Sequence, residues 1–355
     1  MTQMTALERV RALLPQLDVD ALVVHEPATK IYLDALSGSG VWLVITATEA
    51  YQIMDGRYEV AARDYADRFI NQVTPQGSVF TGVLDWIATH HPKRIGIESE
   101  LPYAMYHELE RGCPVVPLHD AIPLIRARKT PAEVARVRAA CRLADDIFPA
   151  LLKQIHVGMT ENDVVGELFR LVYRFGASGV SFDPVICSGP RTAMPHGRAS
   201  GRQIEAGDFL LLDYGVVKDG YQSDMTRTVA VGHATAQFTK LYETLLPIQQ
   251  TMVSRYESGR IGGQLHQEAA NLIATAGYGA YFNHGLGHGL GIGGGERPLI
   301  NATSLDVLQP GMIATCEPGI YVPGVGGIRI EDDVLVTEAG PESLSQTPRE
   351  LLVVG

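Results

Sequence analysis

Cysteine is scarce in this 355-residue chain, and long hydrophobic runs are missing. Its four cysteines, Cys113, Cys141, Cys187 and Cys316, are scattered with no Cys-x-x-Cys pair, which argues against disulfides or a thiolate metal site and favours reduced core cysteines in a cytoplasmic protein. The longest apolar runs, such as "VWLVI" and "FLLL", fall far below the roughly 20 residues that a membrane span needs. We therefore expect neither a disulfide scaffold nor a membrane protein.

Positive charge is also in deficit. The chain has 29 Lys and Arg against 40 Asp and Glu, a formal net charge of -11, which argues against a nucleic-acid or anionic-membrane partner. The opening stretch "MTQMTALERVRALLPQL" lacks the basic stub, apolar core and cleavage site of a secretion signal, and it predicts an amphipathic helix. A small molecule or a peptide is the expected partner.

What the sequence does contain is typical of a soluble chain with two domains, since 46% of its residues are hydrophobic and 19% are charged. Residues 1–125 alternate β-rich runs ("DALVV", "GVWLVIT", "YQIMD") with helical ones ("RYEVAARDYADR", "SVFTGVLDWIATHH"), as a small α/β domain would. A long helix then begins after Thr130, with Pro131 first and Glu133 completing a capping box. We predict an α/β (α+β) fold with domains at 1–125 and 126–355.

The second domain carries a faint internal duplication at an offset of about 101 residues. "HVGMTENDVVGELFRLVYRFG" aligns with "ESGRIGGQLHQEAANLIATAG", which superposes Gly158 on Gly259 and Gly176 on Gly277. Each half ends in strands that carry a pair of acids. A pseudo-twofold axis between the halves would bring those acids together.

One stretch, "NHGLGHGLGIGGGERP" at residues 283–298, is rich in glycine but has no lysine, so it does not fit a phosphate loop. Apolar residues and histidines alternate with glycines over residues 284–293, and this period of two predicts a strand. On a strand, His284 and His288 would point to one face, while the glycines allow close approach of a neighbour.

Acidic residues follow the same strand pattern. In "DFLLLDYGVVKDGYQSDMTRTVAVG", Asp219-Gly220 is a hairpin turn signal that sets Asp213 opposite Thr226 and diagonal to Asp224. "MIATCEPGIYVPGVGGIRIEDDVLVT" reads as two strands that carry Glu317 and Glu331.

These acids adjoin strongly apolar sequence, so several of them should be buried, and an unpaired buried carboxylate costs several kcal/mol. Arg227 and Arg329 could neutralise two at most. Two divalent cations would neutralise all four and also accept an imidazole. Hard oxygen donors with one histidine suit Mn²⁺ or Co²⁺ better than a thiolate zinc site.

At this point the motifs carry a resemblance. "LLLDYGVVKDGYQSDMTRT", "HGLGHGLG", "CEPGIY" and "GIRIEDD" resemble the metal-binding segments of the pita-bread metallopeptidases, which include methionine aminopeptidase, aminopeptidase P and prolidase. The likeness runs from about residue 127 to the end. "SGSG" and "MDGRY" also make residues 1–125 similar to the amino-terminal domain of the creatinase, prolidase and aminopeptidase P branch. The implied fold is a creatinase-type domain followed by a pseudo-twofold pita-bread catalytic domain.

The resemblance also implies a ligand set for two divalent ions, with Mn²⁺ or Co²⁺ preferred and Zn²⁺ as a further option. Asp213 would hold one ion, Asp224 and Glu331 would bridge both, and His288 with Glu317 would complete the second. In the family, the residue equivalent to Glu317 also takes a proton from a metal-bridging water.

Substrate contacts follow from the resemblance too. His284 is implied to contact substrate or stabilise the tetrahedral intermediate, and His196 in "SGPRTAMPHGR" matches a substrate-side histidine. Family members are often homodimers. The chain departs from the pattern at Gly295, where prolidases and aminopeptidases P usually have another histidine.

A dipeptidase must also recognise a free carboxylate, most simply with an arginine. The candidates for substrate contacts are Arg57, Arg191, Arg198, Arg297 and Arg329.

The resulting functional prediction is a two-metal Xaa-Pro dipeptidase, or prolidase, that cleaves the bond before proline in a small peptide. Aminopeptidase P activity on longer peptides is the near alternative. A non-peptide amidohydrolase like creatinase is a weaker one, because creatinase-type members lose the metal ligands and this chain keeps all five. A catalytically inactive binding module of the same fold is weaker still, since such modules lose ligands and add tails.

Overall fold

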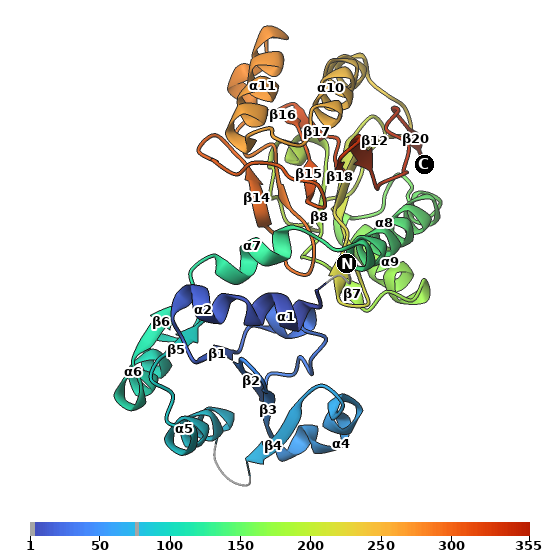
Figure 1. Cartoon of the computed structure of the whole chain (residues 1–355). Coiled ribbons are helices and arrows are strands. Elements are labelled where there is room, and N and C mark those ends of the chain that lie inside the picture. The colour runs from blue at the N-terminus through green and yellow to red at the C-terminus, as the bar shows by residue number, and fades with distance from the viewer. Residues whose placement is uncertain (1–3, 75–77) are drawn as a thin grey trace. The chain divides into compact units, whose positions relative to one another are not determined.

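The computed structural model describes residues 4–74 and 78–355, which form two compact units, Met1–Arg126 and Ala127–Gly355 (Figure 1). Each unit combines helices and strands, as the sequence predicts. No helix among the described residues is long and apolar enough to cross a membrane.

The first unit is built on one six-stranded sheet with the strand order β4-β3-β2-β1-β5-β6. Helix α5, which begins after the N-cap Ser78, packs Val83 and Trp86 against this sheet. The strands are β1 (Ala21–Val24), β2 (Val41–Thr46), β3 (Ala50–Asp55), β4 (Ile70–Thr74), β5 (Ile95–Ile97) and β6 (Val115–Pro117). The helices are α1 (Ala6–Arg11), α2 (Leu13–Leu17), α3 (Pro27–Tyr32), α4 (Glu59–Ala62), α5 (Val79–His90), α6 (Tyr103–Gly112) and α7 (Ala121–Ala127), which ends at the boundary between the units.

Most of the predicted elements of this unit are confirmed, and two differ. The opening helix is interrupted at Ala12, because Pro15 lacks the N–H that would bond the Arg11 carbonyl; residues 1–3 of that prediction lie outside the described part. The helix predicted over "RYEVAARDYADR" is regular only in α4, between the 3₁₀ turns η1 (Gly56–Tyr58) and η2 (Arg63–Tyr65). Ala62 is the one residue that α4 buries, so little packing supports a longer helix.

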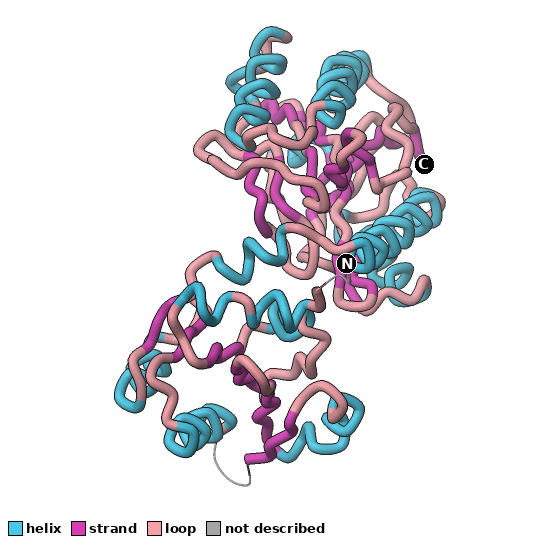
Figure 2. The backbone as a smooth tube through the Cα atoms, viewed as in Figure 1, coloured by secondary structure: helices cyan, strands magenta, loops and turns pink. Residues whose placement is uncertain are grey.

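The second unit has two halves, each with a pair of helices packed on a sheet. In Figure 2 its strands lie in the middle, with one helix pair above them and the other at the lower right. The first half has α8 (Pro131–Leu152), α9 (Glu161–Arg174), η3 (Gly189–Ala193), β7 (Gly179–Val180), β8 (Val185–Ser188), β9 (Phe209–Tyr214), β10 (Val216–Lys218), β11 (Tyr221–Gln222) and β12 (Met225–Val231). The second half has α10 (Ala236–Ser254), α11 (Gly262–Thr275), η4 (Gly279–Tyr281), β13 (Gly287–Gly289), β14 (Glu296–Ile300), β15 (Ile313–Cys316), β16 (Gly319–Val322), β17 (Gly326–Arg329), β18 (Asp332–Thr337), β19 (Gly340–Ser343) and β20 (Val353–Val354).

The main sheets run β20-β12-β9-β8 and β14-β13-β15-β18-β19, with the smaller sheets β11-β10-β7 and β16-β17 beside them. One core joins α8 and α9 to β8, β9 and β12, and the other joins α10 and α11 to the strands of the second half. Each helix pair therefore buries its apolar face against its own half.

The internal duplication seen in the sequence has a structural counterpart. Helices α9 and α11 both have 14 residues, and each is followed by a left-handed glycine, Gly176 or Gly277, with φ of 86° and 89°. Gly158 and Gly259, just before these helices, also have positive φ, and their N–H groups bond the carbonyls of Ile204 and Leu308 at 2.8 Å. The same turn-helix-turn unit thus occurs twice.

The start of α8 is as predicted. The Thr130 hydroxyl accepts the Glu133 N–H at 3.2 Å, and the Glu133 carboxylate accepts the Thr130 N–H at 2.9 Å. This capping box satisfies two of the N–H groups that a helix start leaves unpaired.

Within residues 284–293 the chain forms a strand only over β13, so the longer strand predicted there is wrong outside it. The Glu296 carboxylate accepts the N–H groups of Ile292 and Gly293, at 3.0 and 2.8 Å, and so bends the chain into a turn. Within β13 the glycines are needed for close approach, because a Cβ on Gly287 would lie 2.0 Å from the Thr315 carbonyl.

The two strands predicted for residues 312–337 are in fact four. Pro318 lacks the N–H that would continue β15, and the chain leaves that sheet to form the β16-β17 hairpin before β18 returns to it. Glu317 and Glu331 therefore lie at the two points where the chain leaves and re-enters the main sheet.

Candidate metal centre

Three buried carboxylates meet between the halves of the second unit. Asp213 lies near the end of β9, Asp224 directly precedes β12, and Glu331 directly precedes β18. One oxygen from each lies within 4.8 Å of the others, and the residues are 8%, 6% and 2% exposed. The predicted register is confirmed, since Asp213 pairs with Thr226 across the hairpin.

Glu317 and His288 adjoin this group. Nε2 of His288 lies 3.6 Å from Asp224 Oδ2 and 3.8 Å from Glu317 Oε1. Its Nδ1 lies 3.1 Å from the Gly289 carbonyl, which assigns the proton to Nδ1 and leaves the Nε2 lone pair directed toward the acids. The structure thus brings the five residues proposed as ligands around one cavity.

His284 lies at the same cavity but faces different partners. Its Nδ1 lies 2.7 Å from the Gly285 carbonyl, and its Nε2 lies 2.8 Å from the Tyr321 hydroxyl. Burial and then the positive charge of Arg329 lower the pKa of His284 to about 3. The imidazole is therefore neutral, with Nδ1 donating and Nε2 accepting the Tyr321 hydroxyl proton.

Arg329 supplies one positive charge to the acids from within the protein. It is 2% exposed and pairs with Asp213, while its Nη1 donates to the Tyr321 hydroxyl at 2.8 Å and its Nε to Thr226 Oγ1 at 3.0 Å. These partners hold its guanidinium at the centre, whereas the sequence predicts a substrate contact for Arg329.

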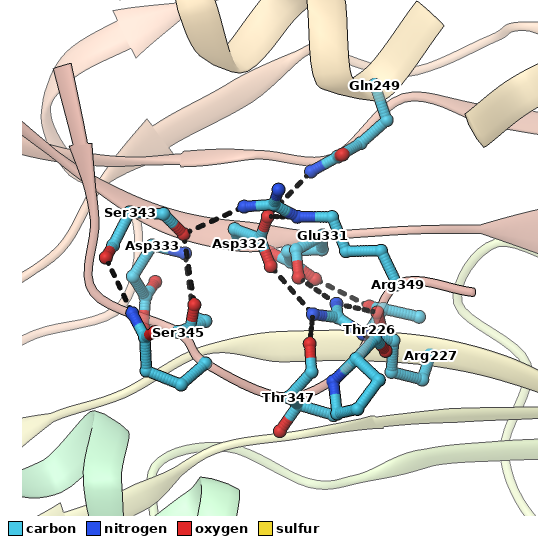
Figure 3. Close-up of polar contacts among 12 residues, drawn as sticks. Thr226, Arg227, Gln249, Glu331, Asp332, Asp333, Ser343, Ser345, Thr347 and Arg349 are labelled. Carbon is cyan, nitrogen blue, oxygen red and sulfur yellow. Dashed lines mark hydrogen bonds and ion pairs between the residues drawn. The ribbon is translucent and has the colours of Figure 1, made fainter. Parts of the chain in front are cut away.

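Arg227 pairs with Asp332 and not with any of the four candidate ligand carboxylates, so the expectation that it could neutralise one of them is wrong. Its Nη2 donates to Asp332 Oδ1 at 2.7 Å and to the Thr347 carbonyl at 2.7 Å (Figure 3). Successive side chains of a strand point to opposite faces, so Arg227 points away from the face of Thr226. Asp332 likewise diverges from Glu331, and the Arg227–Asp332 pair lies on the far side of both ligand-bearing segments.

The electrostatics of the centre call for more positive charge than Arg329 supplies. Burial, and then the neighbouring carboxylates, raise the pKa values of Asp224 and Glu331 well above their usual range. Burial also raises the pKa values of Asp213 and Glu317, against the opposing effects of Arg329 and His288 respectively. Four carboxylates packed this closely stay ionised together only beside strong cations.

A second observation points to a ligand at the same place. Oδ1 of Asp213 is buried and has no hydrogen-bond partner among the described residues. An orphaned carboxylate oxygen in a group of oxygen donors beside one imidazole fits a divalent metal ion. The residues present therefore suit the metal that the sequence predicts.

The cavity has a volume of about 580 Å³, which is large enough for a short peptide. His196 lines it from the loop that follows η3, and the lining also includes Gly294, Gly295 and Leu299. His196 thus shares the cavity with His284 and the acids.

The remaining candidate arginines lie in different settings. Arg297 donates to Asp306 Oδ1 at 2.7 Å and Arg191 binds the buried Glu161 at 3.1 Å, and neither lines the cavity. Arg57 belongs to the first unit, where it pairs with Asp55 at 2.8 Å. Arg198 lines the cavity.

Several residues that sequence reasoning missed support the centre. Tyr321 connects His284 to Arg329, and Thr226 Oγ1 donates to Glu331 Oε2 at 2.5 Å. Asp333 Oδ2 accepts the Asp224 N–H at 3.0 Å. Thr226 and Asp333 were visible as neighbours of the ligands in "DMTRT" and "IEDD", whereas nothing in the sequence indicated the Tyr321 contacts.

Two similar halves with buried carboxylates and an imidazole around one cavity fit a metal-dependent enzyme. The chain belongs to metallopeptidase family M24, whose model matches residues 135–338, and the creatinase/prolidase N-terminal domain model matches residues 7–128. It is therefore a metallopeptidase, a family whose members use divalent metal ions. The expected creatinase-type domain followed by a pita-bread domain is confirmed.

Individual relatives cover nearly the whole chain. The Xaa-Pro dipeptidase of Pyrococcus horikoshii is 34% identical over 353 residues, which is 97% of this chain and 99% of that protein. The structure of an Xaa-Pro dipeptidase from Bacillus anthracis has a TM-score of 0.93 at 33% identity, covering 98% and 99% of the two chains. An X-Pro aminopeptidase from Thermotoga maritima has a TM-score of 0.89 at 29% identity, covering 96% and 99%.

Proposed function

We propose that this metallopeptidase is an Xaa-Pro dipeptidase, a prolidase that hydrolyses the bond before a carboxy-terminal proline. The observation that carries the proposal is the group of three buried carboxylates, the partly exposed Glu317 and one imidazole at a cavity of about 580 Å³. Full-length similarity to proteins named Xaa-Pro dipeptidase supports the choice of substrate.

We assign the ligands as the sequence motifs imply. Asp213 would hold one metal ion, Asp224 and Glu331 would hold both, and His288 with Glu317 would hold the second. When bound, such ions would supply a water molecule of lowered pKa and a polarised scissile carbonyl. The hard, oxygen-rich donors suit Mn²⁺ or Co²⁺, with Zn²⁺ as the alternative.

The side chains around the proposed ions accept a proton from water, contact the peptide and hold one another in position. In this assignment Glu317 accepts the proton of the attacking water, and the Thr315 hydroxyl, 3.2 Å from Oε1, fixes the orientation of its carboxylate. His284 and His196 contact the peptide from the cavity side. Tyr321, held by Arg329, keeps the neutral His284 ring in place.

Three further features belong to the proposal. Residues 1–125 form the creatinase-type domain and residues 126–355 the catalytic domain. The protein works as a homodimer in the cytoplasm, and four buried free cysteines fit a reducing compartment. Sedimentation velocity of the purified protein tests the dimer: a single species of monomer mass would contradict it.

Aminopeptidase P activity is the second candidate function. It is favoured by the wall at Gly294 and Gly295, which carries no side chain beyond hydrogen and leaves room for a longer peptide. The solved X-Pro aminopeptidase is nearly as similar in fold as the dipeptidases. A non-peptide amidohydrolase and an inactive binding module find less support, because all five ligand residues are present at the cavity.

The deciding experiment compares hydrolysis of an Xaa-Pro dipeptide, an Xaa-Pro-Xaa tripeptide and a proline-free dipeptide, each with Mn²⁺ and with a chelator. We expect metal-dependent cleavage of the Xaa-Pro dipeptide above the other two. Faster cleavage of the tripeptide would make the protein an aminopeptidase P. Cleavage that persists in excess chelator, or no cleavage of either proline substrate, would contradict the proposal.

A further inference from the structure

The cavity holds few positive charges that a substrate could use. Of the two arginines among its described lining residues, Arg329 is 2% exposed and is bound to Asp213, Tyr321 and Thr226. Moving its guanidinium to a substrate would break buried bonds at the centre.

Arg198 is the other arginine, and its situation is the opposite. Its side chain is 88% exposed, and its Nη2 lies 3.7 Å from Oδ2 of Asp183, which is 86% exposed and also lines the cavity. A pair this long and this open to water is weak. A second carboxylate can therefore displace Asp183 from Arg198 at little cost.

The backbone that carries Arg198 is nevertheless firmly held. The Arg198 carbonyl accepts Nη2 of Arg191 at 2.5 Å, while Nε of Arg191 binds the fully buried Glu161. The same Glu161 carboxylate accepts the N–H and the hydroxyl of Ser200, two residues further on, at 2.9 and 2.7 Å. Because the backbone at Arg198 is already held, its exposed guanidinium can bind a ligand without ordering of the loop, and only the side chain loses freedom.

Three other lining residues offer no competing cation. They are Gly294, Gly295 and Leu299, and none of these carries a charge or a hydrogen-bonding side chain. The nearby Arg297 is directed to Asp306. A carboxylate inside this cavity thus finds Arg198 as its exposed partner.

We propose that Arg198 binds the carboxy-terminal carboxylate of the dipeptide and so selects dipeptides over longer or amidated substrates. This inference rests on the proposed Xaa-Pro dipeptidase function. A planar guanidinium can hold both carboxylate oxygens at once, whereas a neutral amide offers it one acceptor and no charge.

The test measures binding apart from hydrolysis. The probes are an Xaa-Pro dipeptide whose peptide carbonyl is reduced to methylene, and the same compound amidated at its carboxyl end, titrated calorimetrically into the Mn²⁺-loaded protein. We expect the parent to bind the free acid about 10- to 100-fold more tightly than the amide, and Arg198→Ala to lose that preference. Arg198→Lys, which keeps the charge without the planar fork, should retain part of it.

Arg174→Ala is the matched control, since Arg174 is an exposed arginine of the same unit that lies on α9 and does not line this cavity. It should keep the parental preference. An Arg198→Ala protein that still prefers the acid as strongly as the parent, or a parent without any preference, would overturn the role of Arg198.

Hydrolysis assays distinguish a failure of the role assigned to Arg198 from a failure of the proposed dipeptidase function. With the parent active on the free dipeptide, Arg198→Ala should raise KM for that substrate by about the same 10- to 100-fold while kcat changes much less. A parent that binds the acid preferentially yet cleaves no Xaa-Pro substrate would contradict the dipeptidase function and leave carboxylate recognition by Arg198 standing.

Discussion

At the scale of single residues, Glu331 illustrates how burial and charge create a demand for metal. The residue is 2% exposed, and its carboxylate accepts the Thr226 hydroxyl and lies beside two other acids, Asp213 and Asp224. Replacement by alanine should abolish both activity and metal binding, because a bridging ligand serves both ions. Metal content and turnover measured on the same sample check this, with Glu342→Ala, at an exposed salt bridge to Arg138, as the control. Near-normal turnover in Glu331→Ala would exclude the dinuclear assignment.

His284 should behave differently from the ligands. His284→Ala is expected to lower kcat by roughly 10²- to 10³-fold, the usual effect of removing one stabilising group, while metal content stays near the parental value. Elemental analysis beside steady-state kinetics decides this. Loss of one metal equivalent would show that His284 is a ligand.

The pH profile adds a check on the same residue. Burial and Arg329 depress the His284 pKa to about 3, and a bound cation lowers it further, so His284 stays neutral from about pH 5 to pH 9. The acid limb of the pH-rate profile should therefore have the same midpoint in His284→Ala as in the parent. A midpoint displaced in the variant would mean that His284 titrates in this range.

The residue scale also shows what sequence reasoning can reach. Motif spacing set the strand positions of the acids, so Asp213 and Thr226 pair as expected. The sequence could not predict side-chain contacts between segments that meet only in the folded chain. Arg227 was paired with the wrong acids, and Tyr321 was missed because its contacts arise only when the β16-β17 hairpin packs beside His284 and Arg329.

At the scale of elements, β13 depends on a backbone contact that a side chain would prevent. A Cβ at Gly287 would lie 2.0 Å from the Thr315 carbonyl, so Gly287→Ala must push β13 away from β15 and displace His288 with it. We expect a loss of stability on the order of 1–3 kcal/mol together with weaker metal binding. Denaturant unfolding and metal titration measure the two effects.

Gly166→Ala provides the matched control. Gly166 lies in α9, and a Cβ there would meet no atom within 4 Å, so alanine should be neutral or slightly stabilising through its helix propensity. If Gly287→Ala proved as harmless as this control, the close approach of β13 to β15 would not be essential.

The sequence predicted a helix start and a turn correctly where local capping and turn residues determine them. The capping box at Thr130 and the Asp219-Gly220 turn, with φ of 49° and 80°, formed as expected. The alternating glycines predicted too long a strand, because a segment with a period of two forms a strand only where a neighbouring strand pairs with it. Beyond β13 the N–H groups of Ile292 and Gly293 bond the Glu296 side chain instead of a neighbouring strand.

At the scale of the whole molecule, metal should stabilise the second unit in particular. A ligand present at 100 times its dissociation constant adds about 2.7 kcal/mol, which for a unit of this size corresponds to roughly 5–10 °C in Tm. Chelation should lower Tm by that amount, and hydrogen exchange should accelerate in β9, β12, β15 and β18 but not in β1–β6. An unchanged Tm after complete metal removal would contradict a centre held by both halves.

Composition and strand-helix alternation were sufficient to predict two α/β parts, and the faint repeat pointed to the two helix pairs of the second one. The sheet order was not predictable, because pairings such as β12 with β20 join segments more than a hundred residues apart. Such long-range pairing is decided by tertiary packing that no local pattern contains.

The division of the ligands between the halves has a consequence for how the protein is made. Asp213 and Asp224 leave the ribosome long before Glu317 and Glu331, so a nascent chain that has folded only its first half presents an incomplete set of donors. Such an intermediate should hold metal weakly and exchange it freely. Hydrolytic activity therefore begins only once the last strands of the second half have docked.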